Sequence, residues 1–395
     1  MIFEDSREWT RAQDAADPLA PLRQEFLFPT SCPLYFAGHS LGLQPRRARE
    51  YVLQELDDWA RLGVEGHFAA PNPWVGYHEL LTASTARLVG ALPHEVVVMN
   101  TLTVNLHLLL VSFYQPRPGK HRLLMERGAF PSDRYAAVSH ARFRGFPDAV
   151  LESEDPLRDL SQRGDVALAL IGNVNYVSGR AWDMRALVRA AHASGARIGF
   201  DLAHGAGNLL LTLHEDGADF AAWCNYKYLN AGPGGLGGVF IHERHADAAL
   251  PRFEGWWGHD KARRFEMGPS FSAIRGAEAW QLSNPPILPL AALRASMELF
   301  DQAGMPALRR KGDQLTGYLE WLLRRLGIEV LTPTERGSML TVRFRKAGLV
   351  AELAKRGAAV DLRPPDAVRI TPAPLYNSFE DVRRLAALIG ELHDA

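Results

Sequence analysis

Apolar residues in the middle of the chain gather in short runs that alternate with helical patterns. The runs cover residues 166–171, 197–201, 218–224 and 238–242, and a helical pattern covers about 183–193. Runs that are apolar on both faces and separated by helices are typical of parallel strands in a sheet covered on both sides. We therefore expect an α/β fold with a mostly parallel sheet. Ligands of such sheets bind at the carboxyl ends of the strands.

An amphipathic helix is predicted at 45–61, where apolar residues recur at spacings of three and four after a proline. The positions that define its apolar face are Ala48, Tyr51, Val52, Leu56, Trp59 and Ala60. Glu50, Asp57 and Asp58 lie on the opposite face, which we expect to be solvated.

The pattern changes after residues 284–286, which read Asn-Pro-Pro. Two helical stretches, 287–302 and 306–326, precede four short strands near 328–331, 339–344, 358–362 and 368–371, with a helix before and after the last pair. This order predicts a small α+β domain. We expect three parts: an N-terminal segment, 1–60, that packs with the small domain, a large domain, 61–285, and the small domain, 286–395.

Composition narrows the possible partners. The 395 residues are 47% hydrophobic and 23% charged, as in ordinary globular proteins. The 44 basic residues nearly balance the 45 acidic ones, so no overall field favours nucleic acid or an anionic membrane. Two cysteines are too few for a disulfide scaffold, the apolar runs are too short to span a bilayer, and the N-terminus does not resemble a secretory signal. We expect a cytoplasmic protein.

Candidate chemistry appears at two predicted strand ends. Asp201 ends one strand, and Lys227 follows the next strand 26 residues later. A carboxylate at such an edge can pair with a pyridinium nitrogen, and a lysine there can form a Schiff base with an aldehyde. The two residues together predict a pyridoxal phosphate site. Glycines that permit tight turns follow at 232, 234, 235, 237 and 238.

Two upstream segments fit the same cofactor. Residues 100–107 have the pattern of a hydroxyl-bearing helix start, whose free N–H groups suit a phosphate. Phe130 could stack on the pyridine ring, while Ser132 or Asp133 could hydrogen-bond to it. Taken singly, each feature has an ordinary alternative as a helix cap, a surface lysine or a core phenylalanine. A metal site built from Asp201, His204 and His214 is a rival, although their spacing matches no common ligand motif.

Several longer strings make the chain resemble the kynureninases, which are fold-type-I pyridoxal phosphate hydrolases. The strings are YFAGHSLG at 35–42, NTLTVNLH at 100–107, FPSD at 130–133, FDLAH at 200–204, WCNYKYLN at 223–230, GWWGH at 255–259, SNPPI at 283–287 and RITPAPLYN at 369–377. The resemblance implies a transferase-like large domain with a seven-stranded, mostly parallel sheet flanked by helices, and a small α+β C-terminal domain.

The resemblance also implies roles for individual residues. Lys227 would hold the cofactor, Asp201 would pair with its ring nitrogen, and Tyr226 would relay protons. The implied cofactor-binding residues are Leu102, Thr103, Phe130, Pro131, Ser132, Asp133, Asp201, His204, Tyr226, Lys227, Trp256 and Asn284. Trp256 and Asn284 would come from the second subunit of a homodimer. The implied substrate-binding residues are Ser40, His67, Asn284 and Arg369, with Arg369 on the α-carboxylate.

The implied reaction is hydrolytic cleavage of the Cβ–Cγ bond of L-kynurenine to anthranilate and L-alanine, and of 3-hydroxykynurenine to 3-hydroxyanthranilate, in tryptophan catabolism or NAD biosynthesis. Two positions depart from the family pattern. His39 stands where many relatives carry Asn, and Gly172 stands where relatives often offer a hydroxyl group. The alternatives are another fold-type-I enzyme, such as a cysteine desulfurase-like lyase or an aminotransferase, or a non-catalytic protein that binds pyridoxal phosphate.

Overall fold

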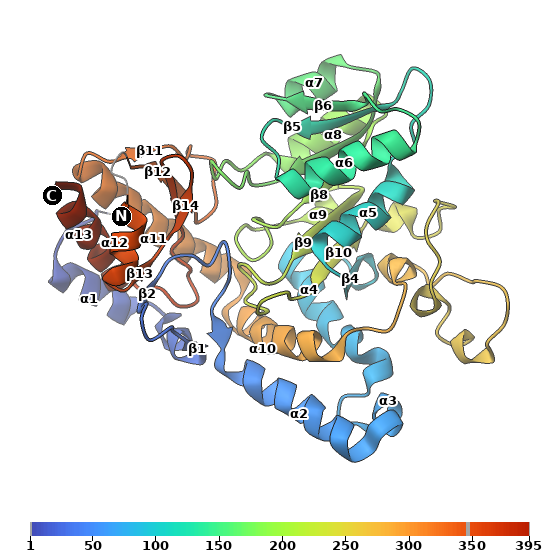
Figure 1. Cartoon of the computed structure of the whole chain (residues 1–395), viewed down its shortest axis with the longest axis horizontal. Helices are drawn as coiled ribbons and strands as arrows, with labels where there is room; N and C mark the ends of the chain where they lie inside the picture. Colours follow the sequence, from blue (N-terminus) through green and yellow to red (C-terminus); the bar gives the residue numbers. More distant parts are fainter. Residues whose placement is uncertain (1, 345–347, 395) are drawn as a thin grey trace.

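The computed structural model describes residues 2–344 and 348–394, and it contains a large sheet and a small one (Figure 1). The large sheet has seven strands in the order β4-β10-β9-β8-β7-β5-β6. Their bounds in that order are Val96–Met99, Gly237–Ile241, Phe220–Cys224, Arg197–Asp201, Val166–Gly172, Arg122–Glu126 and Val150–Ser153. Only β10 pairs antiparallel with its neighbours within this sheet, which confirms the prediction of a mostly parallel sheet.

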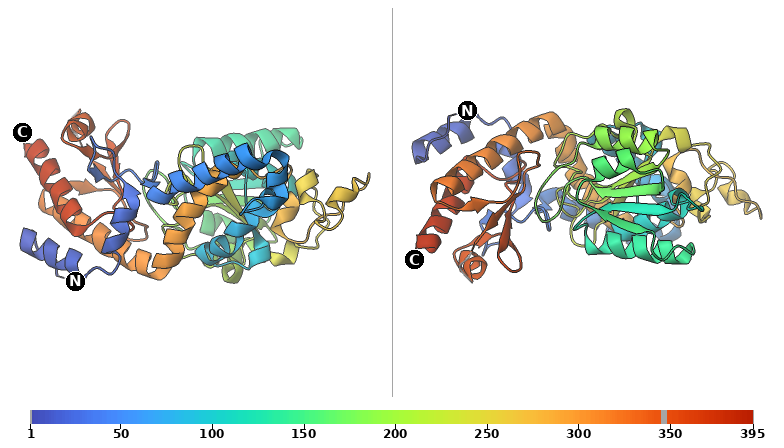
Figure 2. Two further views of the ribbon diagram at one scale, coloured as in Figure 1. Left: turned by 90° about the horizontal axis from the view of Figure 1, so that it is seen from below. Right: turned by 90° about the horizontal axis from the view of Figure 1, so that it is seen from above.

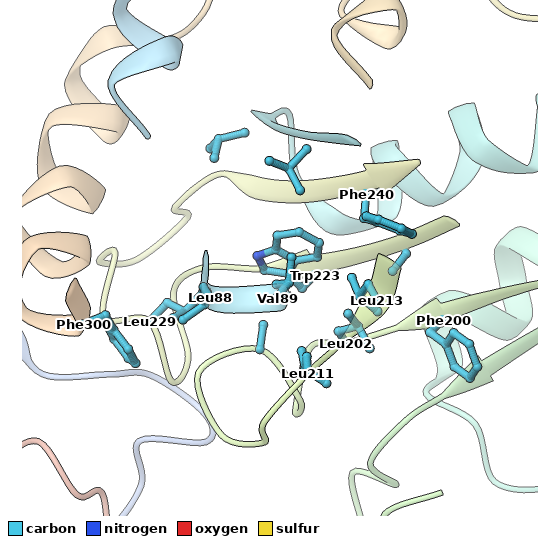
Figure 3. Close-up of a cluster of buried hydrophobic side chains, with 14 of the residues drawn as sticks. Leu88, Val89, Phe200, Leu202, Leu211, Leu213, Trp223, Leu229, Phe240 and Phe300 are labelled. Carbon is cyan, nitrogen blue, oxygen red and sulfur yellow. The ribbon is translucent and has the colours of Figure 1, made fainter. Parts of the chain in front are cut away.

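Helices cover both faces of the large sheet because successive strand residues point to opposite sides. The helices associated with it are α2 (Arg46–Leu62), α3 (Gly66–Ala69), α4 (Thr82–Val89), α5 (Leu102–Phe113), α6 (Pro131–Phe143), α7 (Pro156–Gln162), α8 (Met184–Ala193), α9 (Leu213–Asp216) and α10 (Ile287–Ala303). In β9, Trp223 packs toward α4, α8 and α10, while Phe220 packs toward α5 and α6. Figure 3 shows the buried cluster around Trp223, in which Phe200, Trp223 and Phe240 come from three strands.

The small sheet has four antiparallel strands in the order β11-β12-β15-β14, with helices packed against it. The helices and strands of this C-terminal region are α11 (Met305–Arg325), β11 (Glu329–Val330), β12 (Leu340–Arg343), α12 (Leu349–Lys355), β13 (Ala358–Ala359), β14 (Asp361–Arg363), β15 (Ala367–Ile370) and α13 (Phe379–Asp394). The single strand predicted at 358–362 is two strands with different partners, since β13 leaves the sheet to pair with β2 (Leu34–Tyr35). The α+β composition predicted for this region is confirmed.

The N-terminal segment lies against the small sheet's helices, and both chain ends are at that end of the molecule (Figure 2). Helix α1 (Arg7–Ala16) packs on α13, and the Asp14 carboxylate accepts the backbone N–H groups of Phe379 and Glu380 at 2.7 and 3.1 Å. Strand β1 (Phe26–Leu27) pairs with β3 (Gln44–Pro45) just before α2. Helix α10 begins just after residue 285, and its buried residues pack in the same core as the large sheet. The domain division predicted at residue 285 stays a prediction.

The predicted faces of the helix at 45–61 are wrong toward its C-terminal end. Asp58 is buried and Trp59 is 63% exposed, the reverse of the expectation, and Ala60 is exposed as well. The cause is a polar contact that turns this end of α2 inward. Glu55 accepts the Trp74 indole N–H at 2.9 Å, and Asp58 accepts hydrogen bonds from Gln54 and Arg61 at 3.0 and 2.6 Å.

Candidate active site

A cavity opens at the carboxyl edge of the large sheet, where parallel strands end side by side. The predicted site residues that line it are Leu102, Thr103, Phe130, Ser132, Asp133, Asp201, His204, Tyr226 and Lys227. They come from four segments far apart in the sequence. Asp201 is the last residue of β8 and Lys227 follows the end of β9, and these two strands are neighbours. The fold therefore brings together the carboxylate and the amine that the sequence placed at strand ends.

Glycines allow the chain to close around this edge. Gly237 begins β10 opposite Cys224, and its N–H binds the Asn100 carbonyl at 2.7 Å. A Cβ atom on Gly237 would lie 2.8 Å from the Trp223 carbonyl oxygen, closer than a real side chain allows. A residue with a side chain would push β9, the strand that precedes Lys227, away from α5, the helix that follows β4.

Lys227 lies between an imidazole and an aromatic ring. Its Nζ is 3.2 Å from His204 Nε2 and 5.8 Å from the centroid of Phe130. Burial, together with the charge of Lys227, holds the pKa of His204 well below its usual range. His204 is therefore neutral, and its Nε2 can accept a hydrogen bond from the amine.

Asp201 and Asp133 form a buried carboxyl pair on the floor of the cavity. Asp201 Oδ1 accepts the Ala203 N–H at 2.7 Å, and the side chains of Asp133 and Asp201 hydrogen-bond to each other. Burial raises the pKa of both carboxyl groups, and the charge of Asp201 raises that of Asp133 further. Two buried carboxyl groups in contact hold a proton between them, so this pair suits a ring nitrogen that carries a proton.

The N-terminus of α5 faces the same cavity through Thr101, Leu102 and Thr103. The Thr101 side chain makes no capping hydrogen bond to the helix, so its hydroxyl is available to a ligand. A helix N-terminus offers free N–H groups and a partial positive charge to a phosphate. An amine, a carboxyl pair, an aromatic ring and a helix start together fit the aldehyde, ring nitrogen, ring face and phosphate of pyridoxal phosphate.

Six predicted site residues lie outside the residues that line the cavity, and the sixth, Arg369, is described below. Pro131 is the exposed first residue of α6, and Asn284 is exposed after the 251–283 loops. Trp256 donates its indole N–H to the Arg264 carbonyl at 3.0 Å. The fourth and fifth are Ser40, which is exposed, and His67, whose ring packs on Trp74 at 5.5 Å between centroids. None of these five residues lines the cavity within one chain, although Pro131 lies between Phe130 and Ser132, which do.

Ser40 nevertheless belongs to a segment that contacts the site. The Gly42 N–H binds the carbonyl of Tyr226, the residue before Lys227, at 2.9 Å. His39, the residue before Ser40, is fully buried, and its Nδ1 lies 2.8 Å from the Thr371 hydroxyl. The N-terminal segment therefore forms part of the wall between the cavity and the small sheet.

Arg369 is buried on β15 and is 1% exposed, so its ordinary alternative as a surface arginine is wrong. Its Nε and Nη2 lie 3.1 and 2.9 Å from the two oxygens of Asp361, and Nη1 donates to the Tyr176 carbonyl at 2.8 Å. Tyr176 lines the cavity and its ring packs on Phe130. Arg369 is thereby held against Tyr176, which itself lines the candidate cofactor site.

The rival metal set of Asp201, His204 and His214 is not brought together. His214 Nδ1 lies 3.0 Å from Glu95, which precedes β4 and so lies at the opposite edge of the sheet from Asp201. Glu95 also accepts the N–H groups of Leu92 and Glu243 at 2.8 and 2.7 Å. The Glu95 carboxylate therefore caps backbone N–H groups of two neighbouring turns.

Comparison with known proteins gives the family. The chain is 57% identical to a kynureninase of Myxococcus xanthus (strain DK1622) over 97% of this chain and 96% of the relative. It is 50% identical to a kynureninase of Koribacter versatilis (strain Ellin345) over 97% of this chain and 96% of the relative. Residues 308–389 match a model described as the kynureninase C-terminal domain.

The chain belongs to the kynureninase family. Its enzymes depend on pyridoxal phosphate, so the cofactor predicted from Asp201 and Lys227 is confirmed. The fold-type-I architecture is confirmed by solved structures. The chain resembles the cysteine desulfurase CsdA of Escherichia coli with a TM-score of 0.79 at 18% identity, over 94% of this chain and 98% of that one. It resembles a Thermococcus onnurineus cysteine desulfurase with a TM-score of 0.74 at 18% identity, over the whole of both chains.

The likeness to desulfurases concerns the fold alone, and the cysteines of this chain suit such chemistry poorly. Cys224 is the buried last residue of β9, and burial raises the pKa of its thiol to about 11. A thiol acts as a nucleophile when ionised, so Cys224 is a weak one at neutral pH. The desulfurase-like alternative is not favoured in a kynureninase family member.

Sequence reasoning missed some residues of the cavity. They are Thr101, Glu126, Val174, Tyr176 and Ala203. Glu126 carried the same signal as Asp201, because both end an apolar strand of the sheet. Tyr176 lies in the loop after β7 and carried no local signal, since its place depends on contacts with the small sheet.

Substitution Lys227→Ala removes the amine that the cavity offers to an aldehyde. We expect the purified variant to lack the visible absorbance of lysine-bound pyridoxal phosphate while it keeps the melting temperature of the wild-type apoprotein. The matched control is Lys355→Ala, which removes an exposed lysine paired with Glu352 at the far end of the small sheet. Visible absorbance that persists in the Lys227 variant would exclude Lys227 as the anchoring residue.

Proposed function

We propose that this protein hydrolyses the Cβ–Cγ bond of L-kynurenine with pyridoxal phosphate as cofactor, giving anthranilate and L-alanine. The observation that carries the proposal is the pairing of Asp201 and Lys227 across one cavity in a chain of the kynureninase family. We also propose 3-hydroxykynurenine as a substrate, in tryptophan catabolism or NAD biosynthesis. The unpaired thiols of Cys32 and Cys224 support a cytoplasmic location. Among residues 2–344 and 348–394, no helix has the length and apolar character needed to cross a membrane.

The cavity residues divide the work of proton transfer. Bound pyridoxal phosphate supplies an electron sink for charge that develops on the substrate carbons. Asp201 would hold a proton at the ring nitrogen, which would keep that sink effective. The free amine of Lys227, at Nζ, would remove and return protons at the substrate Cα as a general base. The neutral His204, 3.2 Å from Nζ, orients the amine by accepting its hydrogen bond.

Tyr226 is suited to donate a proton rather than accept one. Burial and the neighbouring Cys224 thiol raise the pKa of its phenol, so the hydroxyl keeps its proton at neutral pH. A protonated phenol beside Lys227 can deliver a proton to a departing carbon and recover it from water that adds to the γ-carbonyl. This arrangement supports the predicted role of Tyr226 as a relay.

Arg369 supplies the binding site for the substrate α-carboxylate in this proposal. Its guanidinium is already held by Asp361 and the Tyr176 carbonyl, so its remaining N–H groups point in fixed directions. A planar guanidinium binds a carboxylate through two parallel hydrogen bonds. Ser40, His67 and Asn284 would contact the aromatic ring of the substrate.

We further propose a homodimer with shared active sites. Trp256 and Asn284 lie outside the cavity of their own chain, so a second chain is needed for them to reach a cofactor. An exposed aromatic patch, Phe68, Trp256 and Phe265, adjoins this region, with ring centroids 5.9 Å apart for Phe68 and Phe265 and 5.5 Å apart for Trp256 and Phe265. Phe68 is 63% exposed and Phe265 is 53% exposed, as expected of a surface that another subunit covers.

The activity itself is tested with the purified holoenzyme and L-kynurenine. We expect anthranilate and L-alanine in equal amounts, measured by anthranilate fluorescence and by amino-acid analysis. Parallel assays with 3-hydroxykynurenine give the ratio of kcat/KM for the two substrates, and an assay with L-cysteine tests the desulfurase alternative. Cleavage of neither kynurenine would contradict the proposal.

Substitution Arg369→Lys keeps the charge but removes the two parallel hydrogen bonds. We expect KM for L-kynurenine to rise about tenfold or more, because a charge-assisted hydrogen bond contributes roughly 1.5–3 kcal/mol, while kcat changes less. The control, Arg343→Lys, alters a half-exposed arginine on the neighbouring strand β12 that pairs with Glu329 and Asp366. An unchanged KM in a folded Arg369 variant would remove this residue from the substrate site.

The shared site is tested by mixing two impaired variants. A dimer of Lys227→Ala with Trp256→Ala contains one site in which both residues are intact, so co-expressed chains should regain activity that neither variant has alone. Phe265→Asp should shift the protein toward monomers in sedimentation analysis, whereas Phe143→Asp, at an 80% exposed position at the end of α6, should leave the oligomer unchanged. Mixed chains with no more activity than the two variants measured separately would rule out sharing.

A further inference from the structure

A third carboxyl group, Glu126, lies in the cavity beside the Asp133 and Asp201 pair. Glu126 is the last residue of β5 and is 4% exposed, and its Oε2 accepts the Trp182 indole N–H at 2.8 Å. Strands β5, β7 and β8 are parallel neighbours, and Gly172 at the end of β7 lies opposite Asp201 in the register. Glu126, Gly172 and Asp201 therefore end three adjacent strands at one edge.

Gly172 makes room for this carboxyl group. A Cβ atom on residue 172 would lie 2.8 Å from Glu126 Oε1, a separation that real Cβ atoms do not adopt. A Cβ atom at position 172 would therefore require the Glu126 carboxyl group, the end of a flexible side chain, to move from its present place beside Trp182. The absence of a side chain at position 172 therefore leaves the space that the Glu126 carboxyl group occupies in the cavity.

The surroundings of Glu126 make its charge matter to the site. Burial raises the pKa of Glu126 to about 7, and the charge of Asp201 raises it as well. The other charged groups that face this corner are Asp133 from α6, Lys227 after β9, and Arg180, whose guanidinium stacks 3.9 Å above the Trp182 ring. Glu126 in turn raises the pKa of Asp133. The three carboxyl groups therefore form one coupled set.

We propose that Glu126 is a positioning residue of the cofactor site, which occupies the space left by Gly172 and acts on the bound ring through Asp133 and Asp201. This inference rests on the proposed function only in requiring pyridoxal phosphate at Lys227. An ionised Glu126 adds negative charge at the floor of the cavity, and this charge favours the protonated form of the lysine-bound cofactor. A protonated Glu126 adds no charge.

The test is the pH titration of the visible spectrum of the holoenzyme. Above about pH 7 Glu126 is ionised in the wild type, so Glu126→Gln should lower the pH at which the bound cofactor loses its proton by roughly 0.5–1 unit. It should also weaken pyridoxal phosphate binding several-fold at pH 8.5. At pH 6 most of the wild-type Glu126 carboxyl groups carry a proton, so the two proteins should differ less in affinity than at pH 8.5. Gln retains an acceptor for Trp182, which preserves the local fold.

The matched control is Glu152→Gln on the adjacent strand β6. Glu152 pairs with Arg134 at 2.6 Å and lies outside the residues that line the cavity. We expect its spectrum and cofactor affinity to match the wild type at both pH values. If Glu126→Gln also matches the wild type in spectral midpoint and in affinity at pH 8.5, the inference is wrong.

The steric part of the proposal has its own test. Gly172→Ala keeps Glu126 but requires its carboxyl group to move, so it should weaken cofactor binding at pH 8.5. Glu126→Ala opens the space, and the double variant E126A/G172A should therefore bind the cofactor as well as E126A alone. Losses that multiply in the double variant would overturn the coupling between the two positions. These readouts need no substrate, so they stand apart from a failure to cleave kynurenine.

Discussion

The burial of acidic groups at the carboxyl edge of the large sheet is the constraint on which the rest of the site depends. An ionised carboxylate without a partner costs several kcal/mol when buried. Asp201 has the Ala203 N–H and Asp133 as partners, and Glu126 has the Trp182 indole. These contacts are fewer than the oxygens can accept. In the proposed function, a ring nitrogen that carries a proton would complete them, and cofactor binding would offset part of the free-energy cost of burying these groups.

The loop between β7 and α8 connects this edge to the small sheet. Its Tyr176 carbonyl accepts from Arg369, its Val177 carbonyl accepts from Thr341, and its Ala181 N–H binds the Glu335 carbonyl at 2.7 Å. The same loop places Trp182 on Glu126. A shift of the small sheet would therefore move the loop that lies between the cofactor floor and the candidate carboxylate site. Arg369, the proposed carboxylate-binding residue, and the packing around Asp201 are therefore connected through these few contacts.

Local patterns were enough to predict four of the seven strands of the large sheet, β7, β8, β9 and β10, and the strand-end positions of Asp201 and Lys227, because buried strands and their edges leave a signal within a few residues. They were not enough for features that depend on distant partners. The inward turn of Asp58 requires Trp74 and Glu55, the two partners of 358–362 require β2, and the burial of Arg369 requires Asp361 and Tyr176. Trp256 and Asn284 were predicted only through the family resemblance, since nothing near them in the sequence indicates a cofactor, and their role stays a prediction.

Although the net charge of the chain is only −1, three carboxyl groups, those of Glu126, Asp133 and Asp201, lie together in the cavity. Exposed charges interact weakly across water and salt, whereas buried groups interact in a medium of lower effective dielectric constant. The charges that a bound cofactor would meet are therefore the local ones at Glu126, Asp133 and Asp201, together with Lys227 and the N-terminus of α5, which line the same cavity. A ligand that carries both a protonated ring nitrogen and a phosphate matches this mixture of carboxyl groups and a positive helix start. In the proposed function, these local charges would orient the cofactor before any contact with substrate.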